Sequence, residues 1–378
     1  MGLINHDDYL TLRANSLMQP DFFSPDFCTA QKLFRRAALA VGARIHTLSL
    51  GFNAPTGYPL EIDIAWLGPL QPKRVLLHIS GIHGVEGFAG SAVQLALLDQ
   101  PPELPDDCAL IMIHVLNPYG MANLRRVNEN NVDLNRNFFT GSGGWHGSPD
   151  GYADLDSFFN PPRPPSRFDF YHGRALLALL RYGKSFINQA VAGGQYCFPK
   201  GIFYGGSRLE AGPKAYIDWL TGHLRDLQEL LVIDVHCGIG TYGGQLLFLS
   251  RHSVNADDLS DALQVPVITR DRACDIMGYM HEGNHSGIYQ QVLPAVRVTC
   301  LTQEFGTYNG LRLLRALRAE NQHHHYGNGD HAHWSKLELK RMFCPDDPVW
   351  RRQVVSQGHT LAQRALWLLG ATSSASHR

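Results

Sequence analysis

Two side chains that could bind a metal ion lie three residues apart in HISGIHGVEGFAGS, residues 78–91. His83 offers an imidazole nitrogen and Glu86 offers a carboxylate oxygen. A zinc hydrolase places such groups on three corners of a tetrahedron and leaves the fourth for water. The apolar residues before His83 and the glycines after it predict a strand that turns into a helix. Because a solvated turn could carry the same pair, the two residues predict a zinc site only if a further ligand joins them.

A third candidate ligand ends another apolar stretch. The segment LLVIDVHCGIGTYGG, residues 230–244, predicts a buried strand that reaches His236 and opens onto a glycine-rich loop. Functional groups of α/β sheets gather beyond the carboxyl ends of the strands, and His83 and His236 both lie at such ends. A histidine on an apolar strand can also be an ordinary core residue. Cys237 should point to the opposite face of the strand and is interpreted as packing.

A polar segment lies between these two strands. Residues 117–139, NPYGMANLRRVNENNVDLNRNFF, follow an apolar strand and carry arginines, asparagines and an aspartate. At this point the sequence resembles the M14 family of zinc carboxypeptidases, which includes acyl-amino-acid deacylases such as aspartoacylase and succinylglutamate desuccinylase. Within that superfamily it is most similar to a bacterial-type branch. The resemblance rests on four segments in family order, HGVE, RVNENNVDLNRNF, DVHCG and LTQEFGT, and covers residues 78–308.

The resemblance implies the metal site and the groups that orient it. His83, Glu86 and His236 correspond to the ligands of one Zn²⁺ ion per chain. Asp133 corresponds to an acid that orients a ligand imidazole, that of His83, since such outer contacts fix metal ligands. Asp234 could do the same for His236, or it could cap a helix or form an ion pair.

The resemblance also implies the residues that act on the substrate. Glu304 corresponds to the general base, which takes a proton from the attacking water and returns it to the leaving amine. Arg126 corresponds to the arginine that polarises the scissile carbonyl, with Arg125 as the alternative. Asn135 and Arg136 correspond to the pair that holds the substrate carboxylate, a task that suits a planar guanidinium.

Two further features are open. Tyr279, in GYMHEGNHSG, resembles the mobile tyrosine of the family, and Tyr289 and Tyr308 are alternatives. The segment GIFYGG, residues 201–206, is a candidate for a wall of the specificity pocket, although glycine-rich segments usually only turn the chain. The histidines of residues 323–333 lie in a polar stretch that predicts a solvated loop rather than a second metal site.

The expected activity is zinc-dependent hydrolysis of an amide bond next to a free carboxylate. A metallocarboxypeptidase that acts on small peptides is the first interpretation, and a deacylase of N-acyl amino acids is the alternative. A metal-free binding protein of the same fold is a remote third.

Short apolar stretches alternate with helix-like segments along the chain. This pattern predicts an α/β fold with a mixed, mostly parallel twisted sheet flanked by helices, which would position these residues. Strands are expected at residues 74–79, 108–116, 230–236, 245–250, 265–269 and 296–303. Helices are expected at residues 87–98, 170–191, 213–230, 311–322 and 350–370. Residues 1–370 would form one domain, with a long loop at about 139–170 that could lie over the site and a disordered tail at 371–378.

Composition fits this interpretation. The 378 residues carry a net charge of −1 with 44% hydrophobic and 18% charged residues, so nothing predicts nucleic-acid or membrane binding. No stretch approaches the roughly 18 uninterrupted apolar residues of a membrane span, and the first residues lack the apolar core of a signal peptide. Seven widely spaced cysteines without a CxxC pair suit reduced thiols. The sequence therefore predicts a cytoplasmic enzyme, and it does not predict the oligomeric state.

Overall fold

One mixed sheet carries the candidate ligands. The computed structural model describes residues 21–54, 56–141, 143–251, 255–269 and 283–375, and within them eight strands join in the order β1-β2-β4-β3-β5-β8-β6-β7. The strands are β1 (Arg44–Asn53), β2 (Pro59–Leu67), β3 (Arg74–Ser80), β4 (Cys108–His114), β5 (Glu229–Gly238), β6 (Gln245–Arg251), β7 (Val267–Thr269) and β8 (Arg297–Gly306). Neighbours β4, β3, β5 and β8 run parallel, so their carboxyl ends meet at one edge of the sheet.

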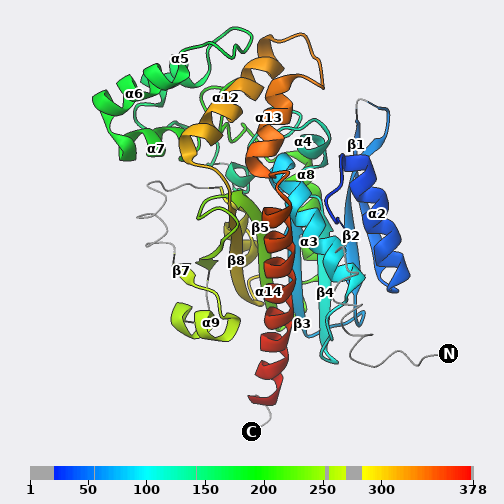
Figure 1. Cartoon of the computed structure of the whole chain (residues 1–378). Coiled ribbons are helices and arrows are strands. Elements are labelled where there is room, and N and C mark those ends of the chain that lie inside the picture. Colours follow the sequence, from blue (N-terminus) through cyan, green and yellow to red (C-terminus); the bar gives the residue numbers. More distant parts are fainter. Residues whose placement is uncertain (1–20, 55, 142, 252–254, 270–282, 376–378) are drawn as a thin grey trace, which may run out of the picture.

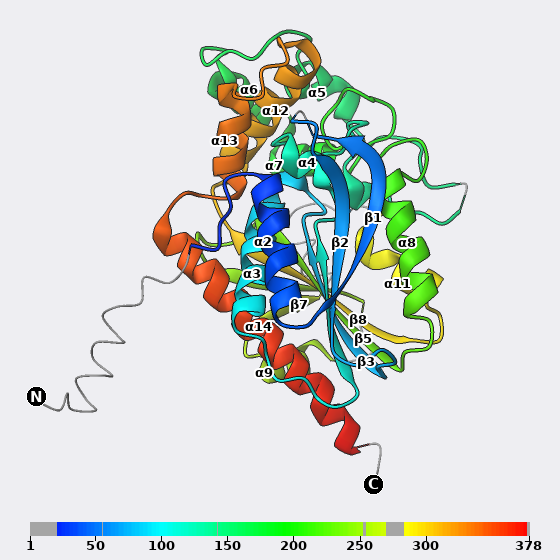
Figure 2. The ribbon, with the colours of Figure 1, turned by 90° about the vertical axis from the view of Figure 1, so that its right-hand side faces the viewer.

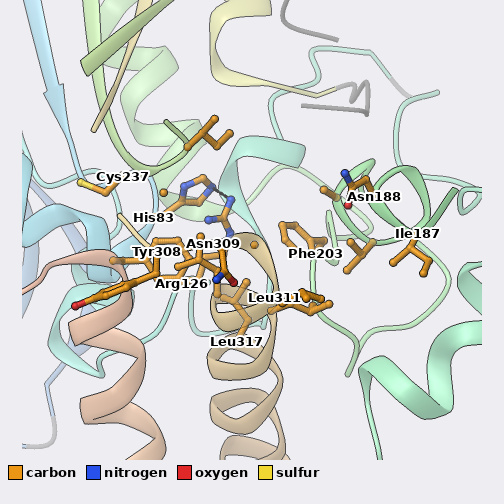
Figure 3. A pocket seen from close by; sticks show the side chains of 18 of the residues that line it. His83, Arg126, Ile187, Asn188, Phe203, Cys237, Tyr308, Asn309, Leu311 and Leu317 are labelled. Carbon is orange, nitrogen blue, oxygen red and sulfur yellow. Dashed lines mark hydrogen bonds between the residues drawn. The ribbon is translucent and has the colours of Figure 1, made fainter. Parts of the chain in front are cut away.

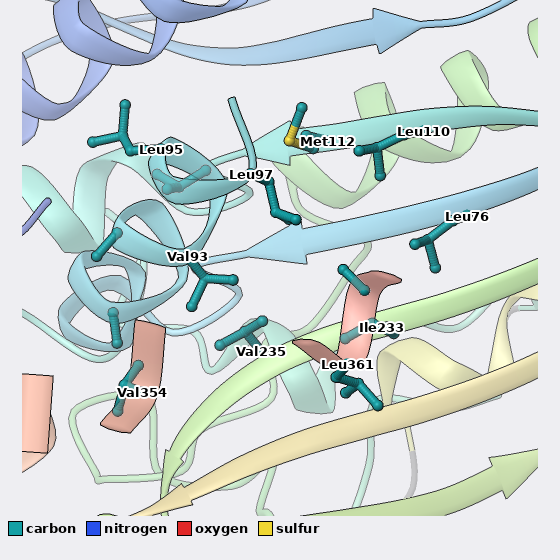
Figure 4. Close-up of a cluster of buried hydrophobic side chains, with 14 of the residues drawn as sticks. Leu76, Val93, Leu95, Leu97, Leu110, Met112, Ile233, Val235, Val354 and Leu361 are labelled. Atoms are coloured by element: carbon teal, nitrogen blue, oxygen red, sulfur yellow. The ribbon is translucent and has the colours of Figure 1, made fainter. Parts of the chain in front are cut away.

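The central strands are covered on both faces. Every residue of β3, β4 and β5 is buried, which explains their nearly continuous Val, Ile and Leu content. On one face α2 (Phe27–Ala40) and α14 (Pro348–Ala375) pack against α3 (Gly87–Asp99), as Figures 1 and 2 show. Side chains of α3 and α14 meet those of β3, β4 and β5 in the core of Figure 4. The other face is covered by α8 (Ala211–His223) and α11 (Tyr289–Val292).

A separate group of helices lies beyond the carboxyl edge of the sheet, at the top of Figure 1. It contains α5 (Tyr152–Phe159), α6 (Tyr171–Tyr182), α7 (Lys184–Ala192), α12 (Gly310–Tyr326) and α13 (Trp334–Phe343). These helices share a hydrophobic cluster of their own, distinct from the two clusters on the faces of the sheet. The shorter elements are η1 (Gly84–Glu86), α4 (Pro118–Ala122), η2 (Leu134–Arg136), α9 (Ala256–Leu263) and η3 (His285–Gly287).

The structure confirms the predicted fold class. Four of the seven strand pairings are parallel, and each of the six predicted strands overlaps an observed one. The strands β1 and β2, which pair antiparallel at one edge, were not predicted from the sequence. Among the described residues, no helix has both the length and the apolar character that a membrane crossing requires.

Some predicted boundaries are wrong. The helix expected at 170–191 is two helices, because Gly183 adopts φ 78 and ψ 161 between α6 and α7. The helix expected at 213–230 ends at His223, and β5 begins at Glu229. The loop expected at 139–170 contains α5, and the tail expected from residue 371 is helical as far as Ala375.

The histidine-rich stretch is also more ordered than expected. Residues 323–325 form the last turn of α12, and His323 is buried and stacks on His333 with ring centres 4.0 Å apart. The first part of this stretch is therefore helical packing and not a solvated loop.

Candidate active site

The turn after β3 is shaped by a close backbone approach. Gly84 follows His83 and donates its N–H to the carbonyl of Arg126 at 3.0 Å, while Val85 donates to the carbonyl of Arg125 at 3.0 Å. A Cβ on Gly84 would lie 2.0 Å from the carbonyl carbon of Gly120. Only glycine fits there, and this contact holds the turn carrying His83 and Glu86 against the loop carrying Arg126.

Three candidate ligands meet at one point. The Nδ1 atom of His83 lies 3.0 Å from one carboxylate oxygen of Glu86, and Nδ1 of His236 lies 3.2 Å from the other. Ligand atoms of all three residues lie within 4.8 Å of one another, and all three side chains are buried. Among the described residues, this is the one group of three or more His, Cys, Asp or Glu side chains that could hold a metal ion.

Two aspartates hold the outer nitrogens of the imidazoles. Nε2 of His83 lies 3.0 Å from Oδ1 of Asp133, and Nε2 of His236 lies 2.8 Å from Oδ2 of Asp234. Both Nδ1 atoms therefore face inward, toward the carboxylate of Glu86. This set of donor atoms fits a zinc ion, because two imidazole nitrogens and a carboxylate point inward. Each imidazole also has an aspartate at its outer nitrogen, as zinc-binding histidines usually do.

The charges around Glu86 suit a ligand. Burial favours its neutral form, but the imidazoles of His83 and His236 and the guanidinium of Arg126 hold the pKa of Glu86 below its usual range. Burial also favours the neutral form of Asp133, and Arg126 and His83 nevertheless hold its pKa well below the usual range. Both carboxylates are thus ionised at neutral pH, as ligation and orientation require.

The two neighbouring arginines lie in different surroundings. Arg126 contacts the cluster directly, because Nη1 lies 2.8 Å from Glu86 and Nε lies 3.1 Å from Asp133. Arg125 is buried, and its Nε donates to Glu320 at 2.9 Å. Lys336 contacts the same carboxylate at 3.0 Å, so Arg125 belongs to an ion-pair network that ties α12 and α13 to this loop. Of the two candidates, the structure brings only Arg126 to the cavity.

Glu304 lies directly across the sheet from a candidate ligand. Its partner in the parallel pairing of β5 and β8 is His236, and both residues line the same cavity. The Glu304 carboxylate is buried and accepts a long hydrogen bond of 3.4 Å from the N–H of Ile239. Burial raises the pKa of Glu304 above its usual range. A carboxyl with a raised pKa beside the cluster can both accept and return a proton.

The predicted carboxylate anchors are placed differently from expectation. Neither Asn135 nor Arg136 is among the described residues that line the cavity. Arg136 is buried and donates to the carbonyl of Ala192 at 2.7 Å and to that of Asn135 at 2.9 Å. Asn135 accepts a hydrogen bond from the N–H of His285 at 3.0 Å. The guanidinium of Arg136 thus holds main-chain carbonyls in place. It is not accessible to a substrate carboxylate, contrary to the prediction from the sequence.

Tyr279 lies outside the described residues. Of its two alternatives, Tyr308 lines the cavity. Tyr289 is fully buried, and its hydroxyl lies 2.6 Å from Nε2 of His285 and 2.8 Å from the hydroxyl of Tyr216. His285 in turn lies 3.5 Å from Asp234, so this buried group supports the aspartate behind His236. His285 was not predicted from the sequence, because nothing in its local pattern indicates this contact.

An apolar cavity of about 670 Å³ adjoins the cluster. Figure 3 shows Phe203 between the His83 and Arg126 side and the residues of α7, with Leu311 and Leu317 projecting from α12. The guanidinium carbons of Arg126 and Arg136 lie 5.2 and 5.8 Å from the ring centre of Phe203. Phe203 adopts φ 57, which is uncommon for a side chain of this size. The GIFYGG segment thus contributes a wall of the cavity.

Solved structures share this fold. The architecture is that of the metallocarboxypeptidases: the structure of bovine thrombin-activatable fibrinolysis inhibitor, in complex with tick carboxypeptidase inhibitor, superimposes with a TM-score of 0.50 at 11% identity, over 92% of this chain and 97% of that one. Carboxypeptidase A from Helicoverpa armigera gives a TM-score of 0.46 at 13% identity, over 93% and 79%. Murein-tripeptide amidase MpaA from Escherichia coli O157 gives 0.36 at 16% identity, over 75% and 93%.

The sequence itself places the chain in a family. Residues 23–357 match the family described as "Protein of unknown function (DUF2817)", so the chain belongs to that family. A search of curated proteins gave no match.

Proposed function

We propose that this protein is a zinc-dependent hydrolase of amide bonds and a member of the M14 superfamily. The observation that carries the proposal is the convergence of His83, Glu86 and His236, with Asp133 and Asp234 holding the outer imidazole nitrogens. A zinc ion supplies a Lewis acid that polarises a carbonyl oxygen and makes water a better nucleophile near neutral pH.

The remaining roles belong to side chains of the chain. Glu304 accepts a proton from the attacking water and delivers it to the leaving amine, since its carboxyl faces the same cavity. Arg126 stabilises the negative charge that develops on the carbonyl oxygen, because it is the described guanidinium that both lines the cavity and touches the cluster. Among the described tyrosines, Tyr308 lines the cavity and is the one that we propose for substrate contact.

The lining of the cavity favours one substrate class over the other. A peptide and an N-acyl amino acid both carry a free carboxylate next to the scissile amide, so the burial of Arg136, which donates to two main-chain carbonyls, does not distinguish them. The apolar side chains that line the cavity, among them Leu179, Ile187 and Phe203, suit an apolar acyl group better than the polar main chain of a peptide. We therefore propose a deacylase of N-acyl amino acids. A metallocarboxypeptidase is the second candidate, supported by the likeness of fold to the carboxypeptidase-type structure above.

The test combines metal analysis with a substrate panel. Purified protein should contain about one zinc per chain and should lose activity on chelation and regain it with zinc, since the ligands must hold the ion. N-acyl amino acids should be cleaved faster than peptides with a free C-terminus, and amidated peptides should show whether a terminal carboxylate matters. Zinc below about 0.2 per chain, with no effect of chelation, would support the metal-free binding protein instead.

A further inference from the structure

The cavity beside the cluster has two chemically different ends. The described charged groups at one end are Glu86, Arg126 and Glu304, next to the candidate ligands. Away from the cluster, the walls come from α6, α7, α12 and the GIFYGG segment and are mostly apolar. They include Leu179, Ile187, Phe203, Leu314 and Leu317. Polar side chains on these walls are few, with Lys184 and Asn188 on α7.

The volume suits a bound group and not only a passage for water. Ligand sites in proteins usually enclose roughly 300–1,000 Å³, and this cavity holds about 670 Å³. Its apolar part is continuous with the cluster, so a group that occupies it can remain attached to the reacting carbonyl.

The walls offer little to a peptide. Three of them are helices, whose main-chain groups are largely bonded within the helix. The N–H and C=O groups of an extended peptide would meet leucine, isoleucine and phenylalanine side chains, and leaving such groups unpaired costs free energy. A methylene chain has no polar groups to satisfy, and each methylene removed from water favours binding.

We propose that this cavity binds an unbranched apolar acyl chain, so that the substrates are amino acids that carry a medium or long N-acyl group. The reaction in this inference rests on the proposed function. Water forms a C–O bond to the acyl carbon while the amide C–N bond breaks. The products are a fatty carboxylate and an amino acid whose amine receives the proton carried by Glu304.

The first experiment measures kcat/KM of the zinc-loaded full chain for N-acyl-L-alanines with saturated chains of increasing length, beginning with acetyl. We expect kcat/KM to rise about fourfold for each added methylene until the cavity is full, because each buried CH₂ contributes at about that level. A change of less than about twofold over the whole series would contradict the proposal. So would faster cleavage of N-blocked leucyl or phenylalanyl dipeptides of similar carbon count.

Neighbouring leucines on α6 provide a matched pair of variants. Leu179 lines the cavity, while Leu180 is 76% exposed. Leu179→Trp should shorten the preferred chain, because the added ring fills part of the cavity, while Leu180→Trp should leave the chain-length profile unchanged. Leu314→Trp on α12 repeats the test from the opposite wall, in case Leu179→Trp does not fold. Equal profiles for the wild type and both cavity variants would overturn the assignment.

A binding measurement separates this inference from the proposed function. Calorimetry should give a dodecanoate Kd at least about tenfold lower for the wild type than for Leu179→Trp, since the added ring fills the cavity. If no amide is hydrolysed but this difference is found, the cavity assignment stands and the proposed reaction fails. If zinc-dependent hydrolysis is found but dodecanoate does not bind, the reaction stands and the acyl-chain assignment fails.

Discussion

At the scale of single residues, the structure separates groups that the sequence presents side by side. Arg125 and Arg126 are adjacent, yet one is enclosed by Glu320 and Asn131 and the other reaches Glu86. A buried ion pair that loses one partner leaves an uncompensated charge. Arg125 is therefore a stabilising residue, and only Arg126 is available to a substrate.

Glu304→Gln tests the proposed proton transfer. The amide keeps the size of the side chain but cannot accept a proton, so kcat should fall by about 10²–10⁴-fold while zinc content and the circular dichroism spectrum stay unchanged. Glu338→Gln on α13 is the control, because this residue pairs with Arg315 and is not among the cavity-lining residues. Retention of activity within about tenfold would assign the proton transfer to another group.

At the scale of elements, α3 is fastened to the sheet through two buried histidines. His114 at the end of β4 lies 2.9 Å from the hydroxyl of Ser91, and His78 on β3 lies 3.4 Å from the side-chain amide of Gln94. Burial lowers the pKa of His78 to about 4 and that of His114 to about 3. Both rings are therefore neutral in the folded protein at neutral pH.

These histidines predict an acid-sensitive fold. Between pH 6.5 and about 4 the unfolded chain binds protons that the folded chain does not, so the free energy of unfolding must decrease as pH falls through this window. Each ring contributes a loss on the order of 2 kcal/mol between pH 7 and pH 5. Urea unfolding of the wild type and of His114→Asn at the two pH values measures this, and the variant should show a smaller decrease. An identical decrease in both proteins would mean that His114 does not contribute.

At the scale of the whole molecule, the cluster joins parts of the chain that are about 150 residues apart. Glu86 follows β3, accepts a hydrogen bond from the N–H of Cys237 at 3.0 Å, and contacts His236 at the end of β5. An ion bound by these residues would link the first half of the sheet to the second.

Zinc should therefore stabilise the folded protein. A ligand present at 100 times its Kd adds about 2.7 kcal/mol to the free energy of unfolding, which corresponds to a rise of a few degrees in Tm. Differential scanning calorimetry of chelated protein with and without added zinc measures the shift. His83→Ala should abolish most of it, and a zinc-dependent shift of equal size in that variant would place the ion elsewhere.

Much of the fold and of the cluster could be predicted from the sequence because the signals are local. The apolar stretches that became β3, β4, β5 and β8 are buried on both faces, and such strands need nearly continuous apolar residues. β1 was missed because none of its residues is buried and polar residues interrupt its apolar ones. The break at Gly183 depends on a positive φ that the composition of α6 and α7 does not indicate.

The sequence by itself determined which residue types stand at the carboxyl ends of the central strands, because parallel strands bring those ends to one edge of the sheet. Together with the four segments that resemble the M14 family, this placement brought His83, Glu86, His236 and Glu304 together as a prediction. Only the tertiary structure decided which neighbouring side chains reach the cavity. Arg136 is covered, Arg126 is accessible, and the leucines of α6 divide between the cavity and the surface. These outcomes depend on packing between segments far apart in the chain, and no local pattern encodes such contacts.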